Sequence, residues 1–231
     1  MTRTKAILAL AAALAFAISP FTTTGFAGFS ADQFPVPQFD PPIQPAGWAF
    51  SIWGVIYLWL IASAGYGLLR RAEDPTWDQT RWPLIASLAI GAAWIPTAVA
   101  SPLWATVLIW AMWVGAILAL LRTPATDTWW LRVPLGLYAG WLTAASCVAT
   151  AILATGYGAT PVLTIHAAFL LLGLALASLV LRRLPSPGYA AAVVWALTGI
   201  LVANLDPVRP LMIALPLIGA VLLALPVLRR A

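Results

Sequence analysis

Charged residues, histidine and cysteine are all scarce in this chain. Only 8% of its 231 residues are charged, and it contains one cysteine and one histidine. Because about a quarter of the residues in a soluble domain are charged, a soluble core of this size would lack the polar shell that keeps it dissolved. The chain is 62% hydrophobic and has a mean hydropathy of +0.94. We therefore expect an integral membrane protein.

The same scarcity excludes several kinds of chemistry. The single cysteine, Cys147, allows neither an intrachain disulfide nor a thiolate cluster, and one histidine cannot form a bis-histidine haem site or a zinc site. The sequence offers no Ser–His–Asp set and no phosphate-binding glycine loop, which disfavours hydrolytic and phosphoryl-transfer catalysis. We expect no catalytic residue, no metal and no obligatory cofactor, and whether the protein is an enzyme stays open.

Eight apolar runs are long enough to cross a bilayer, which takes about 20 residues of helix. They are expected to be helices because lipid offers no hydrogen-bond partner to an open backbone and the runs are too long for barrel strands. The sequence therefore predicts an all-α integral membrane protein with about eight transmembrane helices. The expected limits are residues 5–21, 48–69, 82–100, 103–121, 131–154, 161–181, 188–205 and 210–228.

The basic residues predict the orientation of these spans. When the loops are assigned alternately to two sides, every lysine and arginine except Arg209 falls on the side that holds both termini. The other side receives Asp32, Asp40 and Asp206. Positive charge marks the cytoplasmic side, so we expect cytoplasmic termini in a bacterial inner (plasma) membrane, with the loop 22–47 outside. We interpret the net charge of +5 as a consequence of these orientation-determining basic residues and not as a sign of nucleic-acid binding.

The first span has a second interpretation. Arg3 and Lys5 followed by an Ala- and Leu-rich run resemble the first two regions of a signal peptide, and Phe26–Ala27 would be its cleavage neighbourhood. Cleavage would leave seven spans with the same downstream orientation. A clear small-x-small cleavage site is missing, which favours retention.

The segment 22–47 is the longest loop on the outer side. Its five prolines enforce an extended backbone and forbid a regular helix. Four phenylalanines lie in the same loop, which is more than a solvated linker needs. We expect the loop to fold over the outer ends of the helices as a lid. The prolines are Pro35, Pro37, Pro41, Pro42 and Pro45, and the phenylalanines are Phe26, Phe29, Phe34 and Phe39.

Tryptophan is unusually frequent, with thirteen residues. Five of them lie at predicted span ends and are assigned to an interfacial aromatic belt: Trp77, Trp82, Trp104, Trp129 and Trp130. Other aromatic residues lie deeper, and for each alone interhelical packing is the favoured explanation. Together they predict an aromatic-lined pocket for a flat, apolar ligand in the outer half of the membrane.

The deeper aromatic residues follow helical spacing. Phe50, Trp53 and Tyr57 recur at i, i+3 and i+7 and so share one helix face. Tyr138 and Trp141 repeat the first step of that spacing in the fifth span, and Trp94 lies six residues inside the outer end of the third.

These residues also carry a family resemblance. Pro41–Pro42 followed by GWAFSIWGVIY at 47–57 resembles the start of helix two in the tryptophan-rich sensory protein family, also called the translocator or peripheral benzodiazepine receptor family. The match includes Trp48-x-Phe50 and Trp53-x-x-x-Tyr57. Trp94 and Tyr138-x-x-Trp141 look like the family's aromatic residues in helices three and five. The resemblance covers about residues 5–155.

The chain departs from the family pattern in several places. Gly91 replaces an asparagine, Ala149 and Gly156 lie near the positions of helix-five asparagines, and three further spans follow the five of the family. The resemblance is therefore to a C-terminally extended branch. It implies a translocator-like five-helix bundle at 1–158, with three additional helices at 159–231 packed in the same domain.

The resemblance also implies a function. Family members bind porphyrins, sterols and related flat molecules in the bundle, often as dimers, and bacterial members act in tetrapyrrole responses. The expected partners are the lipid bilayer, a small hydrophobic ligand such as a tetrapyrrole, and a second copy of the chain, with no nucleic acid. The candidate ligand-binding residues are Trp48, Phe50, Trp53, Tyr57, Trp94, Tyr138 and Trp141.

Two other functions stay open. A small-solute or drug/metabolite transporter is suggested by eight spans with several prolines, although no inverted repeat and no charged midplane residue supports it. A membrane scaffold is the other alternative. His166, in the sixth span, is interpreted as a neutral histidine bonded to a neighbouring helix and not as a ligand contact or proton relay. Asn204, Asp206 and Arg209 are read as a cap and a solvated ion pair.

Overall fold

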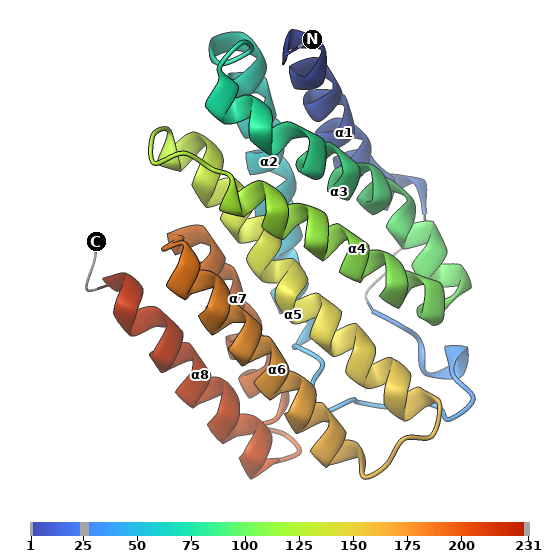
Figure 1. Ribbon diagram of the computed structural model, residues 1–231. Helices are drawn as coiled ribbons and strands as arrows, with labels where there is room; N and C mark the ends of the chain where they lie inside the picture. The colour runs from blue at the N-terminus through green and yellow to red at the C-terminus, as the bar shows by residue number, and fades with distance from the viewer. Residues whose placement is uncertain (1, 24–27, 229–231) are drawn as a thin grey trace.

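The computed structural model describes residues 2–23 and 28–228. Within them the chain forms eight α-helices (Figure 1), so the expected all-α membrane fold is confirmed. Phe26, Ala27 and the basic pair Arg229 and Arg230 lie outside the described residues. The helices are α1 (Thr2–Thr22), α2 (Ile52–Arg70), α3 (Pro75–Ala100), α4 (Pro102–Leu121), α5 (Val133–Gly156), α6 (Val162–Arg183), α7 (Pro187–Ala203) and α8 (Pro210–Leu228).

Six of these helices are long and apolar enough to cross a membrane, counted over the described residues. They are α1 to α6, with α2 and α5 extended by short helical turns at Gly47–Ser51 and Thr128–Arg132. Helices α7 and α8 are apolar as well, and the stretches compared with a span are Pro187–Ala203 and Pro210–Ala224 of the described residues. The helix limits agree with the apolar runs to within a few residues, with the exception of α3.

Helix α3 starts seven residues before its predicted limit because it is capped by polar residues. The Asp74 side chain accepts a hydrogen bond from the Thr76 backbone N–H at 2.8 Å, and Pro75 occupies the first helical position. An aspartate cap followed by proline is a strong start signal. The predicted limit followed the apolar run and missed it.

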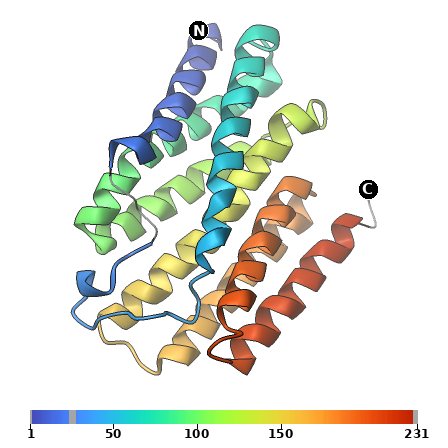
Figure 2. The same ribbon diagram turned by 180° about the vertical axis from the view of Figure 1, so that it is seen from behind.

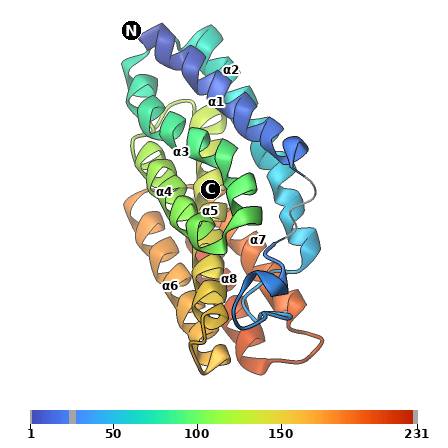
Figure 3. The same ribbon diagram turned by 90° about the vertical axis from the view of Figure 1, so that its right-hand side faces the viewer.

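The first five helices form a closed ring. Contacts run from α1 to α2, from α2 to α5, from α5 to α4, from α4 to α3 and from α3 back to α1. Helices α6 and α7 pack against the outside of α5, and α8 packs against α7 and α6. Figure 3 shows α5 between the two groups. Most residues of α5 are buried, because it belongs to both layers. The division at residue 158 as a domain description stays a prediction.

The helices run alternately up and down, so the two ends of the bundle carry different loops. The start of α1 and the end of α8 lie at one end, together with the α2–α3, α4–α5 and α6–α7 connections (Figures 1 and 2). This is the separation that the charge pattern predicted. The assignment of that end to the cytoplasm stays a prediction.

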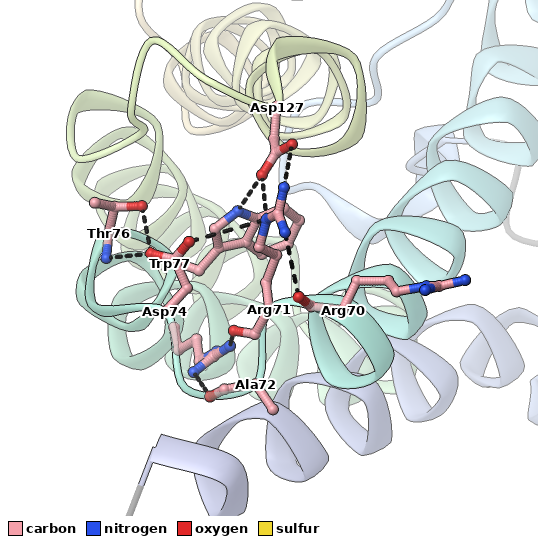
Figure 4. A network of polar contacts seen from close by, with 8 residues as sticks. Arg70, Arg71, Ala72, Asp74, Thr76, Trp77 and Asp127 are labelled. Atoms are coloured by element: carbon pink, nitrogen blue, oxygen red, sulfur yellow. Dashed lines mark hydrogen bonds and ion pairs between the residues drawn. The ribbon is translucent and has the colours of Figure 1, made fainter.

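A polar network joins two connections at this end (Figure 4). The Arg71 guanidinium donates to both carboxylate oxygens of Asp127, at 2.7 and 3.2 Å, and Trp77 Nε1 donates to Asp127 at 3.0 Å. The hydrogen bond from Arg71 holds the pKa of Asp127 below its usual value, against the opposing effect of desolvation. Arg81 donates to the backbone carbonyls of Arg71 and Ala72. The α2–α3 loop is therefore fixed to the α4–α5 connection.

This network corrects one assignment to the aromatic belt. Trp77 is 3% exposed and reaches inward to Asp127, so its indole N–H is satisfied by the protein and not by the membrane interface. The other four belt residues, Trp82, Trp104, Trp129 and Trp130, are exposed, as tryptophan at a membrane interface should be.

Helix α1 is built into the bundle. Lys5 forms an ion pair with Asp78 of α3, and Arg81 donates to the carbonyl of Thr2 at 3.2 Å. One face of α1 is buried, including Ala13 and Phe16. Cleavage within the α1–α2 segment would remove these contacts, which favours the retained span over the signal peptide.

We expect the loop that contains Phe39 and the α2–α3 turn that contains Glu73 to lie on opposite sides of the membrane. Both side chains are exposed, so cysteine at either position should react freely. Phe39→Cys and Glu73→Cys, each with Cys147→Ser, should be labelled by a membrane-impermeant maleimide in right-side-out and inside-out vesicles respectively. Labelling of both from the same side would refute the topology.

Candidate ligand cavity beneath the strap

A cavity of about 240 Å³ lies inside the five-helix ring, and every helix of the ring contributes to its wall. The wall is mostly apolar and rich in aromatic rings. This volume lies just below the range of about 300–1,000 Å³ typical of small-molecule pockets. The lining residues are Phe16, Pro20, Phe50, Trp53, Tyr57, Trp94, Ile95, Ile109, Met112, Trp141 and Ala145.

The aromatic rings hold one another in defined orientations. Trp53 and Tyr57 stack with centroids 5.3 Å apart, and Trp141 meets Trp53 edge-on at 6.2 Å. Phe50 contacts Trp141 edge-on at 5.8 Å. Edge-on and stacked pairs are the favoured geometries of aromatic side chains. The stripe predicted in the second span therefore does face α5, and all three of its residues line the cavity.

Three polar groups in this wall are open to a bound molecule. The indole N–H groups of Trp53 and Trp141 and the hydroxyl of Tyr57 have no hydrogen-bond partner among the described residues. In the described part of the chain, every side-chain nitrogen or oxygen that is shielded from solvent has a hydrogen-bond partner. Because these three groups have no partner, they must be accessible. By contrast, Trp94 Nε1 donates to the Ala105 carbonyl at 2.8 Å. The cavity therefore offers aromatic faces with a few hydrogen-bond donors.

Phe16 of α1 is a wall residue that the sequence reasoning missed. Its ring contacts Trp53 at 5.7 Å, Tyr57 at 5.0 Å and Tyr138 at 5.6 Å, each between ring centroids. Gly91 of α3 makes room for it, since a Cβ there would lie 2.6 Å from the Phe16 ring. The glycine that replaces the family's asparagine thus has a packing reason. A lone phenylalanine in an Ala-rich span carries no periodic signal.

A smaller chamber of about 60 Å³ lies above the main cavity. It shares Phe50, Trp94, Ile109, Trp141 and Ala145 with the main cavity. Its other wall residues include Phe29, Gln44 and Pro45 from residues 28–46, which we call the strap. The strap crosses the ends of the helices on the side opposite the termini (Figure 2). The predicted fold-back of this loop is therefore present, and it forms the roof of the upper chamber.

The strap is bonded to both layers of helices. Gln33 Nε2 donates to the carbonyls of Ala98 and Val99 at the end of α3, each at 2.9 Å. The Val36 N–H donates to the Gly156 carbonyl at 2.9 Å. Further contacts follow on α7, where the Ala46 N–H donates to the Gly199 carbonyl at 3.0 Å and Asn204 donates to Pro42. The α6–α8 layer thus helps to hold the roof.

Arg209 forms its ion pair with the strap and not with Asp206. Its guanidinium lies 2.6 Å from Asp40 and also donates to the Asn204 side-chain oxygen at 3.2 Å. The expected pairing within the α7–α8 connection is therefore wrong. Asn204 is fully buried and caps the end of α7 against the strap.

His166 is fully buried at the junction of α5, α6 and the strap. Its Nδ1 accepts from the Ile43 backbone N–H at 3.3 Å, and its Nε2 lies 3.2 Å from the Thr155 hydroxyl of α5. The expected bond to a neighbouring helix is present. The bond to the strap could not be read from the sequence.

Two of the seven candidate ligand-binding residues lie outside the cavity wall. Trp48 is 44% exposed and contacts Trp195 of α7 edge-on at 5.0 Å. Tyr138 is fully buried and shares a 2.8 Å hydrogen bond with Ser87 of α3. Phe50, Trp53, Tyr57, Trp94 and Trp141 do line the cavity. A role in ligand binding stays a prediction for all seven.

Helices α1 to α5 thus form a ring around an aromatic cavity, and the strap predicted from the prolines and phenylalanines crosses its end. Residues 5–229 match the family model described as TSPO-like protein. The chain belongs to the TSPO-like family. The match runs well beyond residue 155 and includes all of α6, α7 and α8. Searches of curated proteins and of solved structures gave no match.

Membership in the TSPO-like family gives a coarse function. Together with the spanning helices, it identifies an integral membrane protein of the ligand-binding or sensor type.

Proposed function

We propose that this TSPO-like protein binds a flat, apolar molecule of the tetrapyrrole or sterol type between the aromatic rings of its five-helix cavity. The observation that carries the proposal is the convergence of Trp53, Tyr57 and Trp141 on one partly open cavity with unpaired polar groups. A sensor role follows if occupancy changes how the strap or the outer helices are held. The cytoplasmic placement of the termini and a bacterial inner-membrane location belong to the same proposal.

The size of the cavity limits which ligands fit without a change in the structure. A chamber of about 240 Å³ suits a small fused-ring molecule, whereas a full tetrapyrrole requires the aromatic rings or the strap to move. Because the main cavity and the upper chamber share five wall residues, small side-chain shifts would join them. Displacing the strap would enlarge the space further.

The cavity wall also predicts which part of a ligand matters. No charged side chain lines the main cavity among the described residues, so ligand carboxylates find no ionic partner there. Affinity should depend on stacking against the rings and on a few acceptor groups that meet the indole and phenol donors.

We expect the purified protein to bind protoporphyrin IX saturably, with one ligand per chain. Titration followed by Soret absorbance and tryptophan quenching measures this directly. The Trp129→Leu variant is the control, since Trp129 is 65% exposed at the opposite end of the bundle, and its affinity should equal that of the wild type. A signal that rises without saturation, or that Trp129→Leu changes as much as a cavity variant does, would reject the proposal.

A further inference from the structure

The hydrogen bonds around His166 have only one consistent direction. A backbone N–H can only donate, so the bond from Ile43 requires His166 Nδ1 to be an unprotonated acceptor. The proton of the neutral ring then lies on Nε2, which donates to the Thr155 hydroxyl. That hydroxyl lies 2.7 Å from the Gln38 side-chain oxygen, which is closer than its two other acceptors, the carbonyls of Ala151 at 3.1 Å and Ile152 at 3.2 Å. A neutral imidazole therefore bonds the strap twice, at Ile43 directly and at Gln38 through Thr155.

Protonation would break this arrangement. An imidazolium carries a proton on both nitrogens, so its Nδ1–H would point at the Ile43 N–H with no acceptor between them. Arg209 is the charged group whose field reaches His166, and it would repel the new charge, although its own ion pair with Asp40 offsets part of this.

The other charged or titratable groups on the surrounding elements are few. Asp32 is on the strap, Asp206 is in the α7–α8 connection, and Cys147 and Tyr157 are on or just after α5. None of them forms a hydrogen bond or ion pair with the imidazole in the described part of the chain. No carboxylate is bonded to His166 to stabilise its protonated form.

The histidine contact, at Ile43, is one residue away from the roof of the upper chamber. Gln44 and Pro45, which follow Ile43 directly, line the upper chamber. We propose that His166 is a pH-sensitive latch, whose neutral imidazole holds the strap over the cavity and whose protonation releases the segment around Ile43 and admits ligand. The α6–α8 layer would then control access to the five-helix ring. As a means of ligand access the latch rests on the proposed function, but release of the strap can be measured without a ligand.

The test uses a nitroxide spin label at position 39, in the full-length Phe39→Cys, Cys147→Ser protein. Phe39 is 81% exposed and lies between Gln38 and Asp40, so the label reports strap motion without replacing a latch residue. Between about pH 8 and about pH 3.5 we expect the mobile fraction of the spectrum to rise at least about threefold, as the fully buried imidazole gains its proton. His166→Asn keeps an acceptor near the Nδ1 position but cannot titrate, and should abolish the rise.

Two controls make the outcome decisive. Asp40→Asn removes the other titratable contact of the strap, and it should leave the pH response in place. Because the chain contains one histidine, nitrogen-15 NMR of labelled histidine observes this imidazole alone, and it should show the Nε2–H tautomer that titrates together with strap mobility. The latch is overturned if the wild-type strap ignores pH, if His166→Asn keeps the response, if Asp40→Asn removes it, or if the histidine titrates while the strap stays fixed. A loss of the latch with intact porphyrin binding would leave the proposed function standing.

Discussion

Replacing Trp53 or Trp141 with leucine is expected to weaken porphyrin binding by about 5- to 150-fold, equivalent to about 1–3 kcal/mol. Each residue lines the main cavity, and the two rings meet edge-on at 6.2 Å. Leucine keeps an apolar side chain of moderate size but removes the flat face and the unpaired indole N–H. Dissociation constants from Soret titrations, compared with Trp129→Leu, measure the effect.

The two variants should not behave identically. Trp141 is 2% exposed, so its loss leaves a hole in the packing between α2 and α5, and folding must be checked by circular dichroism and size-exclusion chromatography. Trp53 is only partly buried and stacks on Tyr57, so its replacement should disturb the fold less. Equal affinities for Trp53→Leu, Trp141→Leu and Trp129→Leu in folded protein would place the ligand elsewhere.

The helices could be predicted because membrane-spanning segments are specified locally. A run of about 20 apolar residues must pair its backbone internally in lipid, and this needs no knowledge of neighbours. The start of α3 is the one limit that the apolar runs missed, and it supports this explanation. The polar first turns of α3, with Asp74, Thr76 and Asp78, lie outside the apolar run, so only the capping chemistry at Asp74–Pro75 could have revealed them.

The cavity could be predicted in part. Helical spacing correctly grouped Phe50, Trp53 and Tyr57 on one face, because periodicity determines which residues share a face. It does not determine what that face meets. Trp48, at the start of the same segment, turns to Trp195 of α7, and Phe16 of α1 completes the aromatic cluster.

The contacts of the strap are even harder to predict from the sequence than those of the cavity wall. Its prolines predict an extended backbone, but its fixed position depends on contacts across more than a hundred residues, such as Ile43 with His166 and Asp40 with Arg209. His166 is on α6 and Arg209 directly precedes α8, and the residue-level resemblance did not cover this part of the chain. The family match to residue 229 and the bonds to the strap both indicate that these helices work with the ring.

The central claim is that the space inside the five-helix ring is the ligand site, and filling that space tests it most directly. Ala145 of α5 lines both the main cavity and the upper chamber, so Ala145→Phe would place a phenyl ring where the ligand should lie. Ala191→Phe adds the same ring to an exposed position on α7 and is the matched control. The measurement is the affinity of both folded variants for protoporphyrin IX. We expect Ala145→Phe to lose at least about 100-fold in affinity, or about 2.7 kcal/mol, while Ala191→Phe binds as the wild type does; equal affinities for the two variants would contradict the claim.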